Sequence, residues 1–196
     1  MIKVCHMTSA HEEEDIRIFR KECVSLAEAG YDVYLVERGD SYDKNGVHIV
    51  GVGEIPTSRL KRMTAGAKMV YQAARALDAD IYHFHDPELL PYGLKLKKAG
   101  KKVIFDSHEM YIREKPYLPH WFARLLSHAY GKYESHVLGR IDGLVYTCLK
   151  DGVHPFAGKC RHITTIDNTP MLWELYDRYD PAAKKEAGSV VYVGGL

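Results

Sequence analysis

Residues 79–109, ADIYHFHDPELLPYGLKLKKAGKKVIFDSHE, decide the fold class. The segments 79–85 and 101–107 are short and mainly apolar without a clean polar alternation, as in strands covered on both faces. Between them, Pro87 directly follows Asp86, an order typical of a helix start in which Asp86 is the N-cap. A strand, a helix and a second strand predict two parallel strands joined by a helical crossover.

The alternation of strands and helices continues in both directions from this stretch. We predict further strands at 2–7, 31–37, 47–53, 142–148 and 159–168. We predict further helices over 16–30, 58–77 and 119–141, a short helix near 169–177, and a turn-rich loop at 39–46. The fold class is therefore α/β, a doubly wound parallel sheet with helices on both faces and the strand order 3-2-1-4-5-6.

The totals are those of an ordinary globular protein of 196 residues with a net charge of +1. No apolar stretch reaches the roughly 18 residues that span a bilayer, and the acidic N-terminal segment does not resemble a signal peptide. The four cysteines are scattered without a C-x-x-C pair, which favours reduced, buried thiols. We therefore expect a cytoplasmic protein.

Charge is unevenly distributed along the chain. Residues 1–58 carry a net charge of −5, residues 59–102 carry +6, and the remainder is neutral. The helix predicted at 119–141 also carries a basic residue at every fourth position from 124 to 140. A solvated helix face is the default interpretation, and peripheral contact with the inner face of a membrane is the alternative.

Polar side chains collect where three of the predicted strands end. They follow the first strand in TSAHEEED, the fourth in HFHDPE and the fifth in DSHEMY. The carboxyl ends of parallel strands share one edge, and ligands bind where the winding of the sheet reverses. We therefore expect one crevice to be faced by His11, His85, Asp86, Glu88, His108 and Glu109.

The HFHDPE segment has several interpretations. His83 and His85 are two apart on a strand and point the same way, as zinc ligands of the H-x-H type do, with Asp86, Glu88 and His108 as possible further ligands. His83 is alternatively a core histidine with satisfied hydrogen bonds, and a contact to sugar or phosphate is the third interpretation. For Asp86 itself, the helix-capping role is the structural expectation.

The chain resembles the N-terminal domain of family-4 retaining glycosyltransferases, whose GT-B fold consists of two facing Rossmann-like domains. The resemblance rests on DIRIFRKECVSLAEAGYDVYLV, on the 79–109 stretch with HFHDPELLP and DSHE, on the DNTP turn and on the terminal YVGGL. It implies a GT-B N-terminal domain over 1–177, a linker at 178–189, and at 190–196 the first strand and glycine turn of a truncated nucleotide-sugar-binding domain.

The resemblance also implies roles for individual residues. His108 is expected beside the transferred sugar as the catalytic residue. The acceptor and donor-sugar cleft is expected to contain His11, Arg17, His85, Asp86, Glu88 and Glu109. Gly194 and Gly195 are expected near the donor phosphates, whereas the loop after the first strand lacks the glycine that close phosphate approach requires.

The implied activity is hexosyl transfer from a nucleotide-sugar to an acceptor hydroxyl, with retention and with a saccharide or lipid-linked acceptor. It implies no metal and no cofactor beyond the nucleotide-sugar, no nucleic-acid partner, and an isolated acceptor-side domain that is inactive without its C-terminal partner domain. One alternative is a metal-dependent hydrolase using His83, His85, Asp86 and His108. Another is a non-catalytic Rossmann-like binding module.

Overall fold

The computed structural model describes residues 1–107, 120–147, 156–169, 180–182, 184 and 188. The helix predicted near 169–177 and the strand predicted at 190–196 fall almost wholly outside these residues, so the domain boundaries stay predictions.

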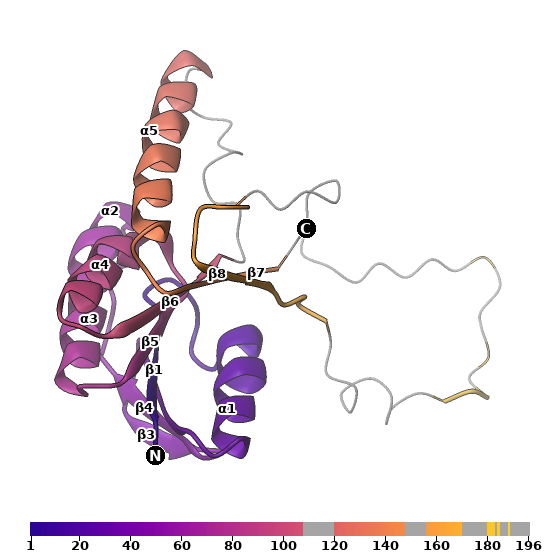
Figure 1. Cartoon of the computed structure of the whole chain (residues 1–196). Coiled ribbons are helices and arrows are strands. Elements are labelled where there is room, and N and C mark those ends of the chain that lie inside the picture. Colours follow the sequence, from indigo (N-terminus) through magenta and orange to yellow (C-terminus); the bar gives the residue numbers. More distant parts are fainter. Residues whose placement is uncertain (108–119, 148–155, 170–179, 183, 185–187, 189–196) are drawn as a thin grey trace.

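A single sheet of eight strands organises the described residues (Figure 1). Its strands are β1 (Lys3–Met7), β2 (Asp32–Glu37), β3 (Tyr42–Lys44), β4 (Val47–Gly51), β5 (Ile81–Phe84), β6 (Lys102–Ser107), β7 (Gly143–Tyr146) and β8 (His162–Thr165). The order is β3-β4-β2-β1-β5-β6-β7-β8, and every pair is parallel except β3 with β4. The predicted order 3-2-1-4-5-6 is thereby confirmed, and β8 extends it by the seventh strand expected at 159–168.

Helices cover both faces of the sheet, as the sequence predicts. They are η1 (Ile16–Cys23), α1 (Val24–Glu28), α2 (Arg59–Lys61), η2 (Arg62–Gly66), α3 (Ala67–Ala76), η3 (Pro87–Leu89), α4 (Leu90–Lys98) and α5 (His120–Leu138). Figure 1 shows α1 on one side of the sheet and α3 and α4 on the other. Among the described helices, none combines the length and apolar character that crossing a membrane requires.

The segment 39–46, predicted as a loop, contains the additional edge strand β3. Asn45 and Gly46 form a two-residue turn, with φ of 50° and 77°, between β3 and β4. Two-residue hairpin turns need positive φ at both positions, and Asn-Gly supplies them at low cost. The segment is too polar to show the apolar alternation of a strand. In the sequence, the Asn45-Gly46 pair is the feature that indicates a hairpin here.

The two faces of the central strands carry different side chains because successive residues of a strand point to opposite faces. Cys5, Met7, Tyr82, Phe84 and Phe105 are buried in the main core with α3 and α4. A smaller core lies on the opposite face, where η1 packs on β2 and β4.

Near its middle, this opposite face is polar. His6 of β1 pairs in register with His83 of β5 and Asp106 lies on β6, and all three are buried. The face of the sheet covered by η1 therefore contains a set of buried polar side chains, and the main core on the other face is apolar.

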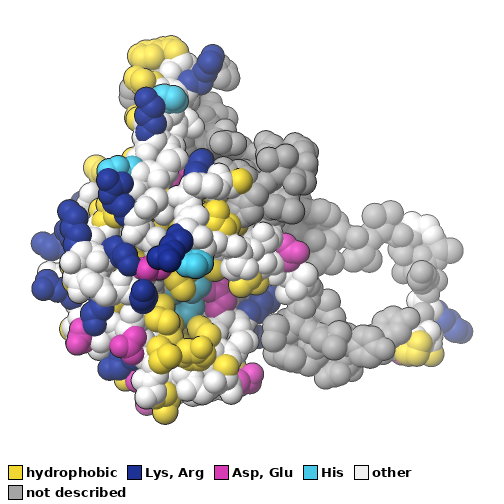
Figure 2. Space-filling view, in the orientation of Figure 1, with side chains coloured by type: hydrophobic (Ala, Val, Ile, Leu, Met, Phe, Trp, Pro, Cys, Tyr) yellow, Lys and Arg dark blue, Asp and Glu magenta, His cyan; other side chains and the backbone are white. Residues whose placement is uncertain are grey.

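Lysine and arginine side chains gather over the face formed by α3 and α4 (Figure 2). Lys68 and Arg75 on α3 and Lys95 on α4 line a surface cavity of about 380 Å³ together with Tyr71 and Tyr92. These three basic residues of the 59–102 segment thus lie on a solvated helical surface, away from the buried polar face of the sheet.

Close packing of α4 on β5 yields a stability prediction. A Cβ atom at Gly93 would lie 2.6 Å from Cε1 of Phe84, so Gly93→Ala must displace a buried ring. We expect the free energy of unfolding to fall by about 1–3 kcal/mol, measured by urea denaturation. The matched control is Gly131→Ala on α5, where the added methyl would lie within 4 Å of no described heavy atom beyond the helix's own backbone and the adjacent residues. Helix propensity alone should then add about 0.5–1 kcal/mol of stability, and an equal loss in both variants would contradict the packing argument.

Candidate functional site

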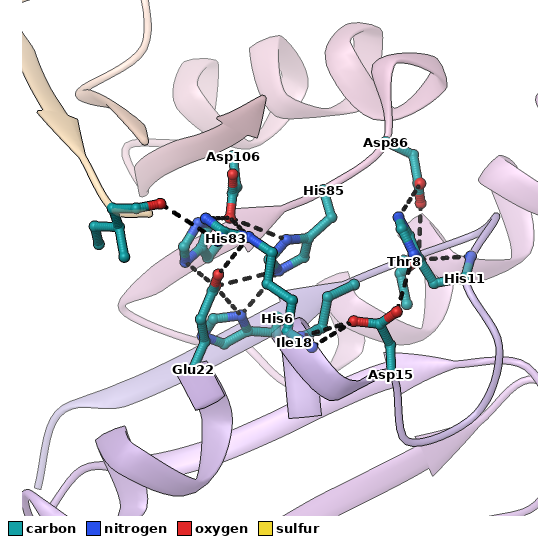
Figure 3. Close-up of polar contacts among 12 residues, drawn as sticks. His6, Thr8, His11, Asp15, Ile18, Glu22, His83, His85, Asp86 and Asp106 are labelled. Atoms are coloured by element: carbon teal, nitrogen blue, oxygen red, sulfur yellow. Dashed lines mark hydrogen bonds and ion pairs between the residues drawn. The ribbon is translucent and has the colours of Figure 1, made fainter. Parts of the chain in front are cut away.

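The carboxyl ends of β1 and β5 meet at a polar mouth organised by Asp86. One carboxylate oxygen of Asp86 accepts a hydrogen bond from the Thr8 hydroxyl at 2.9 Å (Figure 3). The same oxygen accepts from the Ser9 amide at 2.5 Å and from the Ala10 amide at 3.2 Å. Asp86 does occupy the N-cap position before Pro87, but its side chain makes no capping hydrogen bond. The capping expectation is corrected in this respect, because the carboxylate binds the neighbouring loop.

His11 lies in the same mouth between two carboxylates. Its Nε2 is 3.5 Å from Oδ1 of Asp86 and its Nδ1 is 3.4 Å from Oδ2 of Asp15. Asp15 in turn caps η1 by accepting from the amides of Arg17 and Ile18 at 2.8 and 3.0 Å. Burial opposes ionisation of Asp15, but these hydrogen bonds and that of His11 outweigh it and lower its pKa.

Glu88 is a further carboxyl group at the mouth, beside Asp86. Its Oε1 lies 3.4 Å from the Ser9 hydroxyl and 3.4 Å from Nε of Arg62. Burial first, and the nearby Asp86 second, raise the pKa of the Glu88 carboxyl. The Glu88 carboxylate can accept hydrogen bonds from substrate hydroxyls.

A cavity of about 210 Å³ opens beside this mouth. Its walls come from the loops after β1, β2 and β4 and from the start of η2, and they are formed by Ser9, Ala10, Arg38, Ile55, Pro56, Thr57 and Arg62. Two guanidinium groups and two hydroxyls make it suited to an oxygen-rich ligand.

Two acidic residues beside the mouth, Glu14 and Glu37, form hydrogen bonds with groups outside it. Glu14 accepts from Nζ of Lys44 at 2.6 and 2.7 Å and from the Tyr42 hydroxyl at 3.0 Å, which turns it toward the β3 hairpin. The lysine hydrogen bond lowers the pKa of Glu14. Glu37, at the end of β2, is buried and accepts from the Glu14 amide at 3.5 Å. Burial raises the pKa of Glu37 to about 7.

The structure places Arg17 and His85 on the buried face of the sheet instead of at the mouth. Nε and Nη2 of Arg17 donate to Oδ2 of Asp106 at 3.0 and 2.8 Å, and the same oxygen lies 3.6 Å from Nδ1 of His85. His85 also contacts His6, its Nε2 lying 3.1 Å from Nδ1 of that ring. His108, Glu109, Gly194 and Gly195 lie outside the described residues.

Sequence reasoning missed His6, Glu22 and Asp106 on this face. His6 lies inside an apolar run and Glu22 within a helical pattern, so neither stood out alone. The available signal was the alternation of side chains along a strand. It puts His83 and His85 on one face of their strand, and it puts His6 on the opposite face of its own strand from the apolar Cys5 and Met7. Among the described residues, the side chains that could share an ion are His6, Glu22, His83 and His85, a group without Asp86.

An eight-stranded, doubly wound sheet with a polar mouth at its switch point defines a Rossmann-like domain. The model of Glycosyltransferase Family 4 matches residues 19–150, and the chain belongs to this family. A search of curated proteins gave no match.

Solved structures share the fold. Sucrose-phosphate synthase from Thermosynechococcus elongatus superposes with a TM-score of 0.60 at 11% identity, covering 85% of this chain and 48% of that one. A second structure titled as the same enzyme gives 0.58 at 14% identity, covering 88% of this chain and 91% of the other. The chain thus spans about half the length of the first of these proteins, and the likeness places it with GT-B N-terminal domains.

The buried carboxyl of Glu37 makes stability depend on pH. Its folded pKa of about 7 lies above the ordinary value of 4.5, so raising the pH from 4.5 to 7 ionises a carboxyl that the fold holds in a poorly solvated place. The free energy of unfolding should therefore fall across this window, by on the order of 2 kcal/mol.

Glu37→Gln removes the ionisable group and should gain stability relative to the parent chain as the pH rises from 5 to 8, measured by urea denaturation at both values. Glu28→Gln, an exposed acid at the end of α1, is the control and should change little. If the free energy of unfolding changed equally with pH in the Glu37→Gln variant and in the parent chain, the raised pKa of Glu37 would be contradicted.

Proposed function

We propose that this glycosyltransferase chain forms the acceptor-side half of an enzyme that transfers a hexosyl group from a nucleotide-sugar to an acceptor hydroxyl with retention. The observation that carries the proposal is the mouth in which His11, Asp86 and Glu88 meet at the ends of β1 and β5 in a Glycosyltransferase Family 4 chain. Ligands of open α/β sheets bind at this edge.

The transfer needs groups that position the sugar and stabilise the departing diphosphate. We assign His108, which directly follows the last residue of β6, to the transferred sugar, with Glu109 beside it. Glu88 can accept hydrogen bonds from sugar hydroxyls, while Asp86 holds the loop that presents His11 and Ser9. Asp86 therefore acts as a positioning residue in this proposal.

The acceptor is proposed to enter the cavity lined by Arg38 and Arg62. Guanidinium groups and hydroxyls bind oxygen-rich molecules, which agrees with a saccharide or lipid-linked acceptor. Exposed basic residues on α5, among them Arg124 and Lys132, are compatible with peripheral membrane contact by such an acceptor-binding domain.

A second domain is proposed to hold most contacts to the nucleotide-sugar, with Gly194 and Gly195 at its first turn. The support is that the chain spans 48% of the sucrose-phosphate synthase that it resembles in fold. The isolated chain should then bind acceptor without transferring sugar. Robust transfer by the 196-residue chain alone would contradict this division of labour.

The decisive experiment measures sugar transfer from a panel of labelled nucleotide-sugars by the protein carrying both domains. His108→Ala should lower kcat by about 100-fold or more, because a positioned donor at the reacting centre is lost. Glu28→Gln, remote from the mouth on α1, is the matched control and should retain full activity. Near-normal turnover of His108→Ala would remove the assignment, and no transfer with any donor would favour a binding module.

Glu88→Gln tests the mouth independently of His108. The substitution keeps the shape but removes the charge facing Arg62 and Ser9, so we expect a five- to tenfold rise in the KM for the acceptor, corresponding to about 1 kcal/mol. Steady-state kinetics at varied acceptor concentration provide the measurement. An unchanged KM, with the fold intact by circular dichroism, would place the acceptor elsewhere.

A further inference from the structure

Three histidines and one glutamate form a compact group on the buried face of the sheet, here called the histidine cluster: His6, Glu22, His83 and His85. His6 and His83 are paired residues of β1 and β5, and His85 follows two residues later on the same face. Glu22 reaches the group from η1, which lies over this face (Figure 3). Two neighbouring strands and the helix above them thus contribute the four side chains.

The four side chains are spaced as ligands of one ion. Oε2 of Glu22 lies 3.8 Å from Nδ1 of His6, 3.8 Å from Nδ1 of His83 and 3.8 Å from Nε2 of His85. One ligand atom from each residue falls within 4.8 Å of all the others. Tetrahedral ligands at bonds of about 2.1 Å are roughly 3.4 Å apart, so small side-chain movements would close the site.

The cluster is buried, yet an ion can reach it. The side chains of His6 and His85 have no exposed surface, while those of His83 and Glu22 are 11% and 13% exposed. His6, His83 and Glu22 line a cavity of about 550 Å³ on this face. The carboxyl of Glu22 is buried at both oxygens, and its Oε1 lies 3.1 Å from Nε of Arg17, so Oε2 is the oxygen that faces the histidines.

The surroundings orient the rings for metal binding. Oδ2 of Asp106, fixed by Arg17, lies 3.6 Å from Nδ1 of His85, so that Nε2 of this ring points into the cluster. A carboxylate behind a metal-binding histidine is the usual second partner of such a ring.

We propose that His6, Glu22, His83 and His85 bind one zinc ion in a closed tetrahedral site. Three imidazoles and one carboxylate are a donor set that zinc accepts, and four protein ligands leave no open position for a substrate. The ion would therefore tie η1 to β1 and β5 as a structural element. The site lies on the sheet face and is independent of the proposed sugar transfer.

The test uses the full chain after dialysis against a chelator. Titration with zinc, followed by calorimetry, should show one ion per chain and raise the melting temperature by several degrees. Cobalt(II) should bind at the same site and give the intense visible absorption of a four-coordinate ion. Absence of stoichiometric zinc binding, or a cobalt spectrum typical of six-coordinate hydrated ion, would overturn the proposal in favour of a metal-free hydrogen-bonded group.

Two variants locate the ion. His83→Ala, at the rim of the cavity, and Glu22→Gln, which keeps the side-chain shape, should each weaken zinc binding by about 100-fold or more. His48→Ala, an exposed histidine on β4 beside Asp43, is the matched control and should bind zinc as the parent chain does. Unchanged affinity in folded Glu22→Gln, or an equal loss in His48→Ala, would assign the ion to another place.

Discussion

The parallel pairing of β1 with β5 is the constraint on which the rest of the structure depends. It sets Met7 opposite Phe84 in the main core and His6 opposite His83 on the other face. One step beyond the paired residues, the same register brings Thr8 and Ser9 within hydrogen-bonding reach of Asp86. A shift by one residue would expose the core and separate both polar groups, because alternate side chains of a strand point to opposite faces.

The ion pair between Arg17 and Asp106 fixes the helical segment η1 on this sheet. Both side chains are buried, and the guanidinium donates twice to one carboxylate oxygen. The desolvation of such a pair offsets much of its Coulomb attraction, so its net contribution to stability is small. Its geometric effect is larger, since a bidentate arginine accepts few orientations. The pair holds η1 at the height at which Glu22 faces the histidines.

The sequence was sufficient for the order of the parallel strands, because apolar runs that end in turns alternate with helical patterns along most of the chain, although β2 and β4 are joined through β3 and not through a helix. It was also sufficient to group His11, Asp86 and Glu88, which follow strands that end at one edge. It did not predict that Asp86 would bind the neighbouring loop, since that depends on the register of β1 and β5. His85 was placed at the mouth because it ends a strand, whereas continued alternation after His83 turns it to the buried face.

The segment from Asp15 to Glu22 connects the two polar groups physically. At its start, Asp15 caps η1 and holds Nδ1 of His11, whose other nitrogen faces Asp86 at the mouth. One residue before the end of η1, Glu22 joins the histidine cluster, with its Oε2 3.8 Å from Nε2 of His85. Because a hydrogen-bonded helical segment moves largely as one unit, whatever anchors Glu22 also limits the movement of Asp15 and His11. The mouth and the histidine cluster therefore depend on the placement of the same helical segment, although their side chains lie on different parts of the sheet.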